Sequence, residues 1–155
     1  MKNVSISLTG IIFLAISACT KAVDISAEKV AIEKVLVNYV VSVENEDMEL
    51  YTRNVVHDKA MVNYGAFGNP IVGWDALKKV IEDQNTMLSE IKIDVSDLKI
   101  HVYETGKFAW ATCLWSFKAL MAENPIVLAV RCTWVLEKRE PGWVIIHFHK
   151  SVPVS

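Results

Sequence analysis

Hydrophobic positions in the first half of the chain recur with helical spacing. Between residues 26 and 44 they fall three and four residues apart, which predicts an amphipathic helix with one buried face and Ser26 as its N-cap. A second short helix is expected over 48–55, a short strand over 61–64 and a third helix over 73–88. The positions that form the first stripe are Ile32, Val35, Leu36, Tyr39, Val40 and Val43.

The second half of the chain changes to a period of two, which is typical of half-buried strands. Turn residues at 104–107, 122–124 and 140–142 divide it into four segments, 90–103, 107–120, 125–138 and 142–152. Strands joined by such short connections are antiparallel neighbours. The sequence therefore predicts an α+β domain, a cone in which three N-terminal helices pack on a curved, mainly antiparallel sheet.

The register of the two central strands follows from their connection. A turn centred near Glu123 places Cys113 opposite Cys132, close enough for a cross-strand disulfide or for two buried thiols that face each other. We favour the thiols, because a cross-strand disulfide distorts the ladder. The same register puts Trp110 and Arg131 on one face of the sheet.

Composition raises the question of a membrane protein, since the mean hydropathy is +0.29. Part of this hydrophobicity lies in residues 8–19, a run too short and too interrupted to span a bilayer but typical of a secretory signal. Ile16-Ser17-Ala18-Cys19 resembles the bacterial lipobox, whose cysteine is lipidated. An ordinary signal peptide is the alternative.

The lipobox resemblance sets the expected organisation of the chain. It implies a lipoprotein signal peptide over 1–18, a tether over 19–26 and a folded domain over 27–155, with lipidation at Cys19. Thr20 follows the cysteine where an Asp would favour the inner membrane. We therefore expect an exported, membrane-anchored lipoprotein on the periplasmic face of the outer membrane, held to the membrane through its lipid alone.

Charge and cysteine usage exclude several partners. The chain has 16 Lys and Arg against 18 Asp and Glu, a formal charge of −2, and loss of Lys2 with the signal leaves −3. This balance argues against a nucleic-acid partner. The sequence contains no Cys-x-x-Cys pair, and the four histidines show no recognisable metal spacing with a third ligand. We expect no metal and no cofactor, and His147 and His149 to make structural hydrogen bonds.

Two motifs carry a resemblance to a known superfamily. Trp143 and, after three residues, His147-Phe148-His149-Lys150-Ser151 closely resemble the last strand of the calcium/calmodulin-dependent protein kinase II association domain. Gly73-Trp74-Asp75 resembles the element before the third helix of SnoaL-like domains. The chain is thus similar to the nuclear transport factor 2-like (cystatin-like) superfamily over residues 28–152. That scaffold hosts enzymes, binding proteins and assembly modules alike.

The resemblance allows the enzyme alternative to be tested by position. In ketosteroid-isomerase-like members a Tyr on the first helix polarises a carbonyl and an Asp ending the first strand is the base. Tyr39 falls at the first position, but Asn63, or Tyr64 after a shift of one residue, falls at the second. Neither serves as a carboxylate base. Asp58 is nearby, and we interpret it as a turn residue.

The same resemblance directs attention to cationic side chains. Lys150 stands where the association domain has an Arg that points into a deep pocket, and Arg131 matches a second Arg of that pocket. We predict that both hold an anionic ligand such as a carboxylate, with Tyr39, Trp74 and Trp110 as walls and His149 as a further ligand-binding residue. Alternatively, Arg131 pairs with an acid such as Asp83 or lies at a dimer face.

Two function classes remain open. One is a non-catalytic module that binds a small, anionic molecule or assembles into a homodimer or higher oligomer. The other is an isomerase, hydratase or cyclase of the SnoaL type, which needs a carboxylate or histidine, for example Asp83 or His101, inside the pocket. Trp115, Phe117 and Trp134 share the second sheet face, which suggests that this face pairs in a homodimer.

Overall fold

Three helices form the first half of the chain in the computed structural model, which describes residues 22–153. The cap of the first helix is Asp24, whose Oδ1 accepts from the Ala27 amide at 3.1 Å, so the expected N-cap at Ser26 is wrong. Asp24 is in the extended conformation that a cap requires, whereas Ser26 lies inside the first turn. The helices are α1 (Ile25–Glu44), α2 (Met48–Asn54) and α3 (Trp74–Met87).

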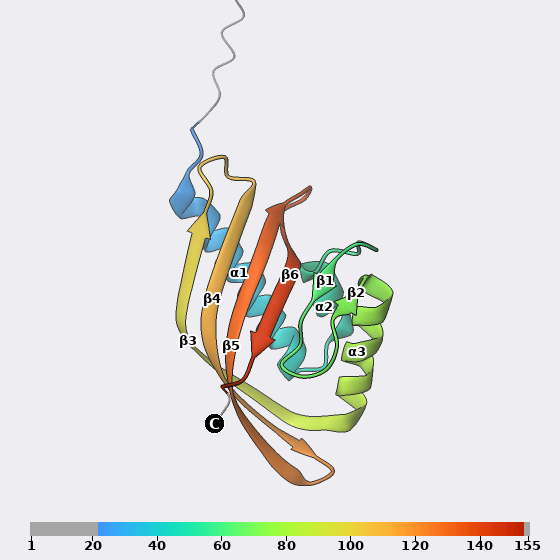
Figure 1. The fold of residues 1–155 in the computed structure, drawn as a ribbon. Helices are drawn as coiled ribbons and strands as arrows, with labels where there is room; N and C mark the ends of the chain where they lie inside the picture. The colour runs from blue at the N-terminus through green and yellow to red at the C-terminus, as the bar shows by residue number, and fades with distance from the viewer. Residues whose placement is uncertain (1–21, 154–155) are drawn as a thin grey trace, which may run out of the picture.

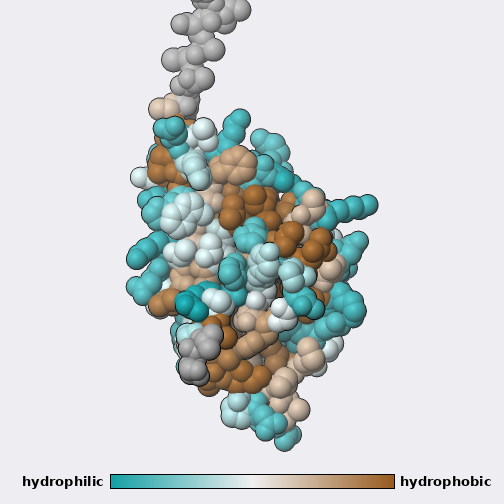
Figure 2. Space-filling model, viewed as in Figure 1, coloured by the Kyte–Doolittle hydropathy of each residue, from teal (hydrophilic) through white to brown (hydrophobic). Residues whose placement is uncertain are grey.

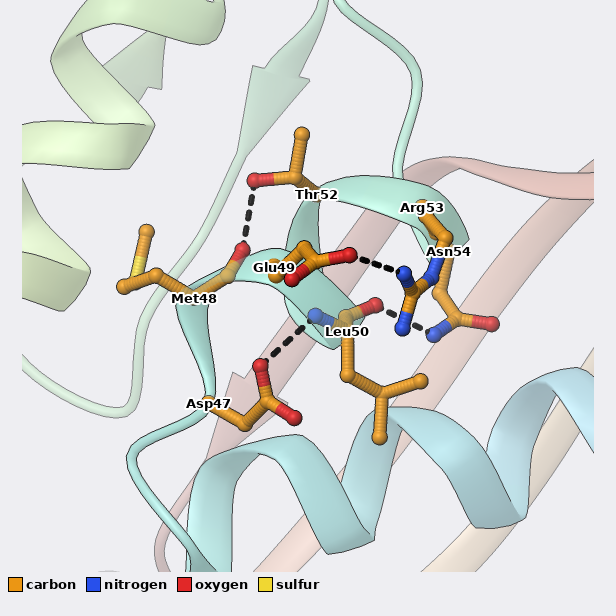
Figure 3. A network of polar contacts seen from close by, with 7 residues as sticks. All are labelled: Asp47, Met48, Glu49, Leu50, Thr52, Arg53 and Asn54. Atoms are coloured by element: carbon orange, nitrogen blue, oxygen red, sulfur yellow. Dashed lines mark hydrogen bonds and ion pairs between the residues drawn. The ribbon is translucent and has the colours of Figure 1, made fainter.

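The short helix α2 depends on side-chain caps at both ends (Figure 3). The Leu50 amide donates to Asp47 Oδ1 at 2.9 Å, and Asn54 Nδ2 donates to the Leu50 carbonyl at 2.6 Å. The Leu50 amide is one of the first-turn N–H groups that a helix leaves open, and Asp47 satisfies it, while Asn54 adds a side-chain bond within this seven-residue helix. These hydrogen bonds stabilise α2, which carries the buried side chain of Tyr51.

Four long strands form an antiparallel meander in the order β3-β4-β5-β6 (Figure 1). The prediction of an α+β domain with three helices against an antiparallel four-strand sheet is therefore confirmed. A separate two-stranded sheet pairs β1 with β2, and β2 was not expected from the sequence. The strands are β1 (Val62–Asn63), β2 (Ile71–Val72), β3 (Leu88–Val102), β4 (Phe108–Met121), β5 (Asn124–Lys138) and β6 (Trp143–Ser151).

The helices cover one face of this sheet, and α1 crosses behind it in Figure 1. The stripe predicted on α1 supplies the contact, since Ile32, Leu36, Tyr39 and Val43 are buried. No described helix covers the opposite face of the sheet in Figure 1, and Figure 2 shows that side as pale and hydrophilic surface with separate hydrophobic patches. The sheet thus has an inner face under the helices and an outer face without cover from the described residues.

Two bulges curve β3 around the core. The pairing with β4 shifts register between Ser89 and Lys92 and again between Ser96 and Lys99. Each shift contains a residue in the left-handed region, Glu90 at φ 52° and Asp97 at φ 54°. A bulge inserts one residue and bends its strand, so the inward set changes parity after Val95. This bend leaves space between the sheet and α3.

The signal peptide predicted over 1–18 and the lipidation predicted at Cys19 fall outside the described residues. Within residues 22–153, no helix combines the length and the apolar character needed to cross a membrane.

Candidate functional site

A cavity of about 590 Å³ lies between α3, the 65–71 loop and the curled ends of β4 and β5. That volume is within the range of small-molecule sites. Its walls are aliphatic and aromatic, and only Gln84 and Lys150 among the lining residues carry polar side chains. The other lining residues are Val43, Gly65, Ala66, Phe67, Ile71, Val80, Ile81, Met87, Leu88, Trp115, Phe117, Met121, Ile126, Leu128, Val130 and Phe148.

Lys150 carries the one charged group of this lining, and aromatic rings surround it. Its Nζ lies 4.5 Å from the ring centroid of Trp115, 5.0 Å from that of Phe148 and 5.1 Å from that of Tyr39. It donates to the Tyr39 hydroxyl at 3.1 Å. Among the ion pairs of the described residues, none involves Lys150. The cavity therefore holds a cation without a counter-ion from residues 22–153.

A bulge in β6 turns Lys150 inward. The pairing with β5 passes from Val135–His147 to Leu136–Ile145, so Ile146 is the extra residue. Uninterrupted alternation would put Val144 and Ile146 on the face of Phe148 and Lys150, but the bulge breaks that alternation. Ile145 and Phe148 are both buried although they are three residues apart, because the bulge changes parity between them.

The strand β6 is then fixed from its other edge. The Lys150 amide donates to the Tyr64 carbonyl at 2.9 Å, and the Tyr64 amide donates to the Phe148 carbonyl at 3.0 Å. Asn63, which is fully buried, accepts from the Phe148 amide through Oδ1 at 2.8 Å. These bonds hold the backbone on both sides of Lys150, so its side chain enters the cavity from a rigid support.

Burial sets the protonation of these groups. Loss of solvation lowers the pKa of Lys150 below its ordinary value, and the nearby Tyr51, Cys132 and Cys113 only partly offset this. Burial likewise raises the pKa of Tyr39 and of Tyr51, so both hydroxyls stay protonated at neutral pH. Lys150 is the group of this set that lines the cavity, and the Tyr39 hydroxyl lies behind it as its hydrogen-bond partner.

Several buried polar groups near Lys150 have no hydrogen-bond partner within the described part of the chain. They include the Tyr51 hydroxyl and the indole N–H groups of Trp115 and Trp134. Trp115 lines the cavity itself. An unsatisfied buried donor costs about 1 to 3 kcal/mol, so such groups are usually paired with water or a ligand. The Trp115 N–H is therefore a donor that an acceptor or an anion in the cavity could pair with.

The predicted pairing of Arg131 with Lys150 is wrong. Arg131 is exposed, and its Nη2 donates to the Val152 carbonyl at 3.2 Å. It shares a face with Trp110, as the register predicted, but this is the outer face of the sheet. Trp110 stacks there on His101, with ring centroids 3.9 Å apart and an angle of 11° between planes. Neither residue reaches the cavity, because Cys132, the neighbour of Arg131, is the one that points inward.

Trp74 and His149 also lie away from the cavity. Trp74 stacks on His57 with ring centroids 4.1 Å apart, beside the start of α3. His149 is exposed and contacts Tyr64, with ring centroids 5.5 Å apart. Of the six predicted ligand-binding residues, the structure brings together Tyr39 and Lys150.

The positions that an acid–base enzyme would use hold no base. Asn63 accepts a backbone hydrogen bond, and Tyr64 is exposed. Asp58 is a turn residue, as interpreted, whose Oδ1 accepts from the Ala60 amide at 2.9 Å. Asp83 pairs with Lys79 on the surface rather than with Arg131, and His101 lies on the outer face. The cavity lining contains no carboxylate and no imidazole.

The cysteine register is confirmed. Cys113 lies opposite Cys132, and Cys132 lies opposite Lys150, so the three form one row across β4, β5 and β6 on the inner face. Both cysteines are buried free thiols. A hydrogen bond between them lowers the pKa of Cys132 and raises that of Cys113. Among the described residues, no cluster of His, Cys, Asp or Glu is arranged to hold a metal ion.

Trp115 and Trp134 are core residues, which corrects the expectation that they form a dimer face. Trp115 is 3% exposed and Trp134 is 1% exposed, and their ring centroids are 5.7 Å apart. Sequence reasoning missed Trp115, Phe117 and Phe148 as cavity walls. The alternation in β4 could have identified Trp115 and Phe117, because both share the parity of Cys113; Phe148 lies in β6, beyond the bulge at Ile146.

Comparison with known proteins places this chain in a family. Residues 32–155 match the SnoaL-like domain family. Because this match covers most of the chain, the protein belongs to the SnoaL-like family, within the NTF2-like superfamily. Among curated proteins, none matches the chain.

Solved structures share the fold at low identity. A candidate dehydratase of the NTF2-like family from Streptomyces avermitilis is 12% identical, with a TM-score of 0.76 over 84% of this chain and 99% of its own. An NTF2-like superfamily protein from Salmonella enterica serovar Typhimurium is 24% identical, with a TM-score of 0.75 over 84% and 94%. The CaMKII hub from S. rosetta is 22% identical, with a TM-score of 0.66 over 79% and 95%.

Proposed function

We propose that the protein binds a small, largely apolar molecule with one anionic group, such as a carboxylate, in the cavity under α3. The observation that carries this proposal is the position of Lys150, whose Nζ contacts three aromatic rings and a hydroxyl but no carboxylate of the described chain. A buried cation without a counter-ion is costly. An anionic ligand supplies the missing charge, and the apolar walls bind the remainder of the molecule.

Acid–base catalysis of the isomerase type is less well supported. Such a reaction needs a group near the substrate that takes a proton at neutral pH. The lining offers an amide at Gln84 and an amine at Lys150. Similarity to a candidate dehydratase concerns the fold alone, so the binding module remains our conclusion.

Titration calorimetry with decanoate tests this function. Replacing Lys150 by Met is expected to weaken decanoate binding about 10- to 100-fold, since a hydrogen bond to a charged group contributes roughly 1.5 to 3 kcal/mol. Decanol, which has the same chain without the charge, should bind both proteins alike.

Lys118 offers a matched control, because it is an exposed lysine paired with Asp94 on the surface. Lys118→Met should leave decanoate binding unchanged. Equal affinities of wild type and Lys150→Met for decanoate would refute the proposed role of Lys150.

The outer face of the sheet supports a second proposal, on assembly. We propose that the outer face of the sheet pairs two copies of the chain, since Phe108, Trp110 and Leu114 expose large apolar side chains there. Light scattering should then show a dimer that Leu114→Glu dissociates. Resemblance to the kinase association domain, whose hub is among the similar folds, supports a homo-oligomer.

For the start of the chain, the lipobox sequence supports an exported protein anchored by a lipid on Cys19. Metabolic labelling with palmitate, lost in Cys19→Ala, tests this directly.

A further inference from the structure

Lys150 differs from the paired lysines of the structure in what it contacts. Lys79, Lys118 and Lys138 each lie within ion-pair distance of a carboxylate. Lys150 contacts rings and the Tyr39 hydroxyl instead. A carboxylate partner would keep the amine protonated and would hold it in an ion pair, so that it could not react with a ligand. Without one, the Lys150 nitrogen is a primary amine at the wall of an apolar cavity, open to a ligand's reactive atom.

We propose that Lys150 forms an imine with apolar aldehydes that enter the cavity, so that the protein carries or processes such aldehydes covalently. The proposal rests on the proposed function in one respect, namely that the same cavity admits an apolar ligand. It goes further in naming a second ligand class and a bond. The amine, the adjacent hydroxyl and the water-poor walls are the parts that this chemistry requires.

The reaction balances without an oxidant or a reductant. The Lys150 ammonium gives up a proton, and the nitrogen lone pair attacks the carbonyl carbon to form a carbinolamine. The hydroxyl group then leaves with that proton as water, and a protonated C=N bond remains. Tyr39, whose Oη is 3.1 Å from Nζ, is the group placed to relay the proton. Net, one ammonium and one aldehyde give one iminium and one water.

The surroundings of Nζ favour both stages of this reaction. Burial lowers the pKa of Lys150, which increases the share of neutral, nucleophilic amine at a given pH. The product iminium is again a cation, at the position of the original ammonium. The faces of Tyr39, Trp115 and Phe148 stabilise a cation there through their ring quadrupoles. The apolar walls also exclude water that would reverse the step.

Reductive trapping with decanal tests the proposal. The protein is incubated with decanal and sodium cyanoborohydride, whose hydride reduces the iminium to a stable secondary amine, and labelled lysines are mapped by peptide mass spectrometry. We expect Lys150 to be labelled about 10-fold or more faster than the exposed lysines, as a desolvated amine should be. Decanoate, which occupies the same cavity, should protect Lys150 in the wild-type protein.

Lys150→Arg is the matched variant, because it keeps the positive charge but cannot form an imine. The decanal adduct at this position should be absent from Lys150→Arg, whereas Lys118→Arg, which changes an exposed lysine outside the cavity, should leave the labelling of Lys150 unchanged. Labelling of Lys150 no faster than that of Lys118, or labelling that decanoate does not reduce, would overturn the proposal. If decanoate binds and Lys150 stays unlabelled, the imine proposal fails alone. If decanoate does not bind either, the proposed function fails with it.

Discussion

Replacing Trp134 by Ala is expected to lower the free energy of unfolding by about 3 to 5 kcal/mol, the usual loss for a large aromatic residue in a core. Trp134 is 1% exposed and lies at the centre of an aromatic cluster. Its ring centroid is 6.1 Å from that of Tyr39 and 5.7 Å from that of Trp115. The alanine variant leaves a void that neither ring fills without losing contacts elsewhere.

Urea denaturation followed by circular dichroism measures this loss. Trp110 supplies the matched control, because it is a tryptophan on the neighbouring strand that is 37% exposed. Trp110→Ala should cost about 1 kcal/mol or less, as expected for a side chain outside the core. Similar losses for the two variants would mean that the inner face of the sheet is not the core.

Replacing Lys150 by Met is expected to stabilise the protein by about 1 to 3 kcal/mol at neutral pH, although it weakens decanoate binding. A buried charge without an ionic partner costs free energy that an apolar side chain of similar length does not. At position 150, methionine thus favours the stability of the fold, whereas lysine favours binding of the anionic ligand. Such opposition is typical of functional residues, whose environment is set for the ligand rather than for the fold.

The gain in stability of Lys150→Met over the wild-type protein should decrease as the pH rises. The pKa of Lys150 is lower in the folded protein than in the unfolded chain. Between the two values the unfolded state binds more protons, so wild-type stability rises with pH through this window. The advantage of Lys150→Met should therefore be largest below the folded-state pKa and shrink as the pH approaches about 10.4, the ordinary lysine value. Urea denaturation across this range measures it, and a difference independent of pH would contradict the burial of the charge.

The parts of the fold that depend on local pattern were predictable. The short turn before Asn124 fixed the register of β4 and β5, so the opposition of Cys113 and Cys132 followed from counting alone. The stripe on α1 identified Ile32, Leu36 and Tyr39 as buried. These features depend on periodicity and turn length, which the sequence shows directly.

Which face of the sheet the helices cover could not be predicted from these local patterns. Counting placed Arg131 and Trp110 together but could not say which face the helices cover. In β6, the bulge at Ile146 puts Ile145 and Phe148 on the same buried face although they are three residues apart. An alternating pattern shows which residues share a face but not which of the two faces is buried. One inserted residue moves all later side chains of the strand to the opposite face. The structure therefore places Lys150, which a family motif indicated, in the cavity lining, and Tyr39, which a helix stripe indicated, beside Lys150 Nζ. Arg131 lies on the outer face instead.

The most direct test of the account is a crystal structure of the protein with decanoate bound. We expect a carboxylate oxygen within about 3.2 Å of Lys150 Nζ, with the alkyl chain extending past Trp115 and Phe117 beneath α3. Decanoate bound on the outer face beside Trp110, with the cavity holding no ligand, would contradict the claim that Lys150 forms the anion end of a ligand site.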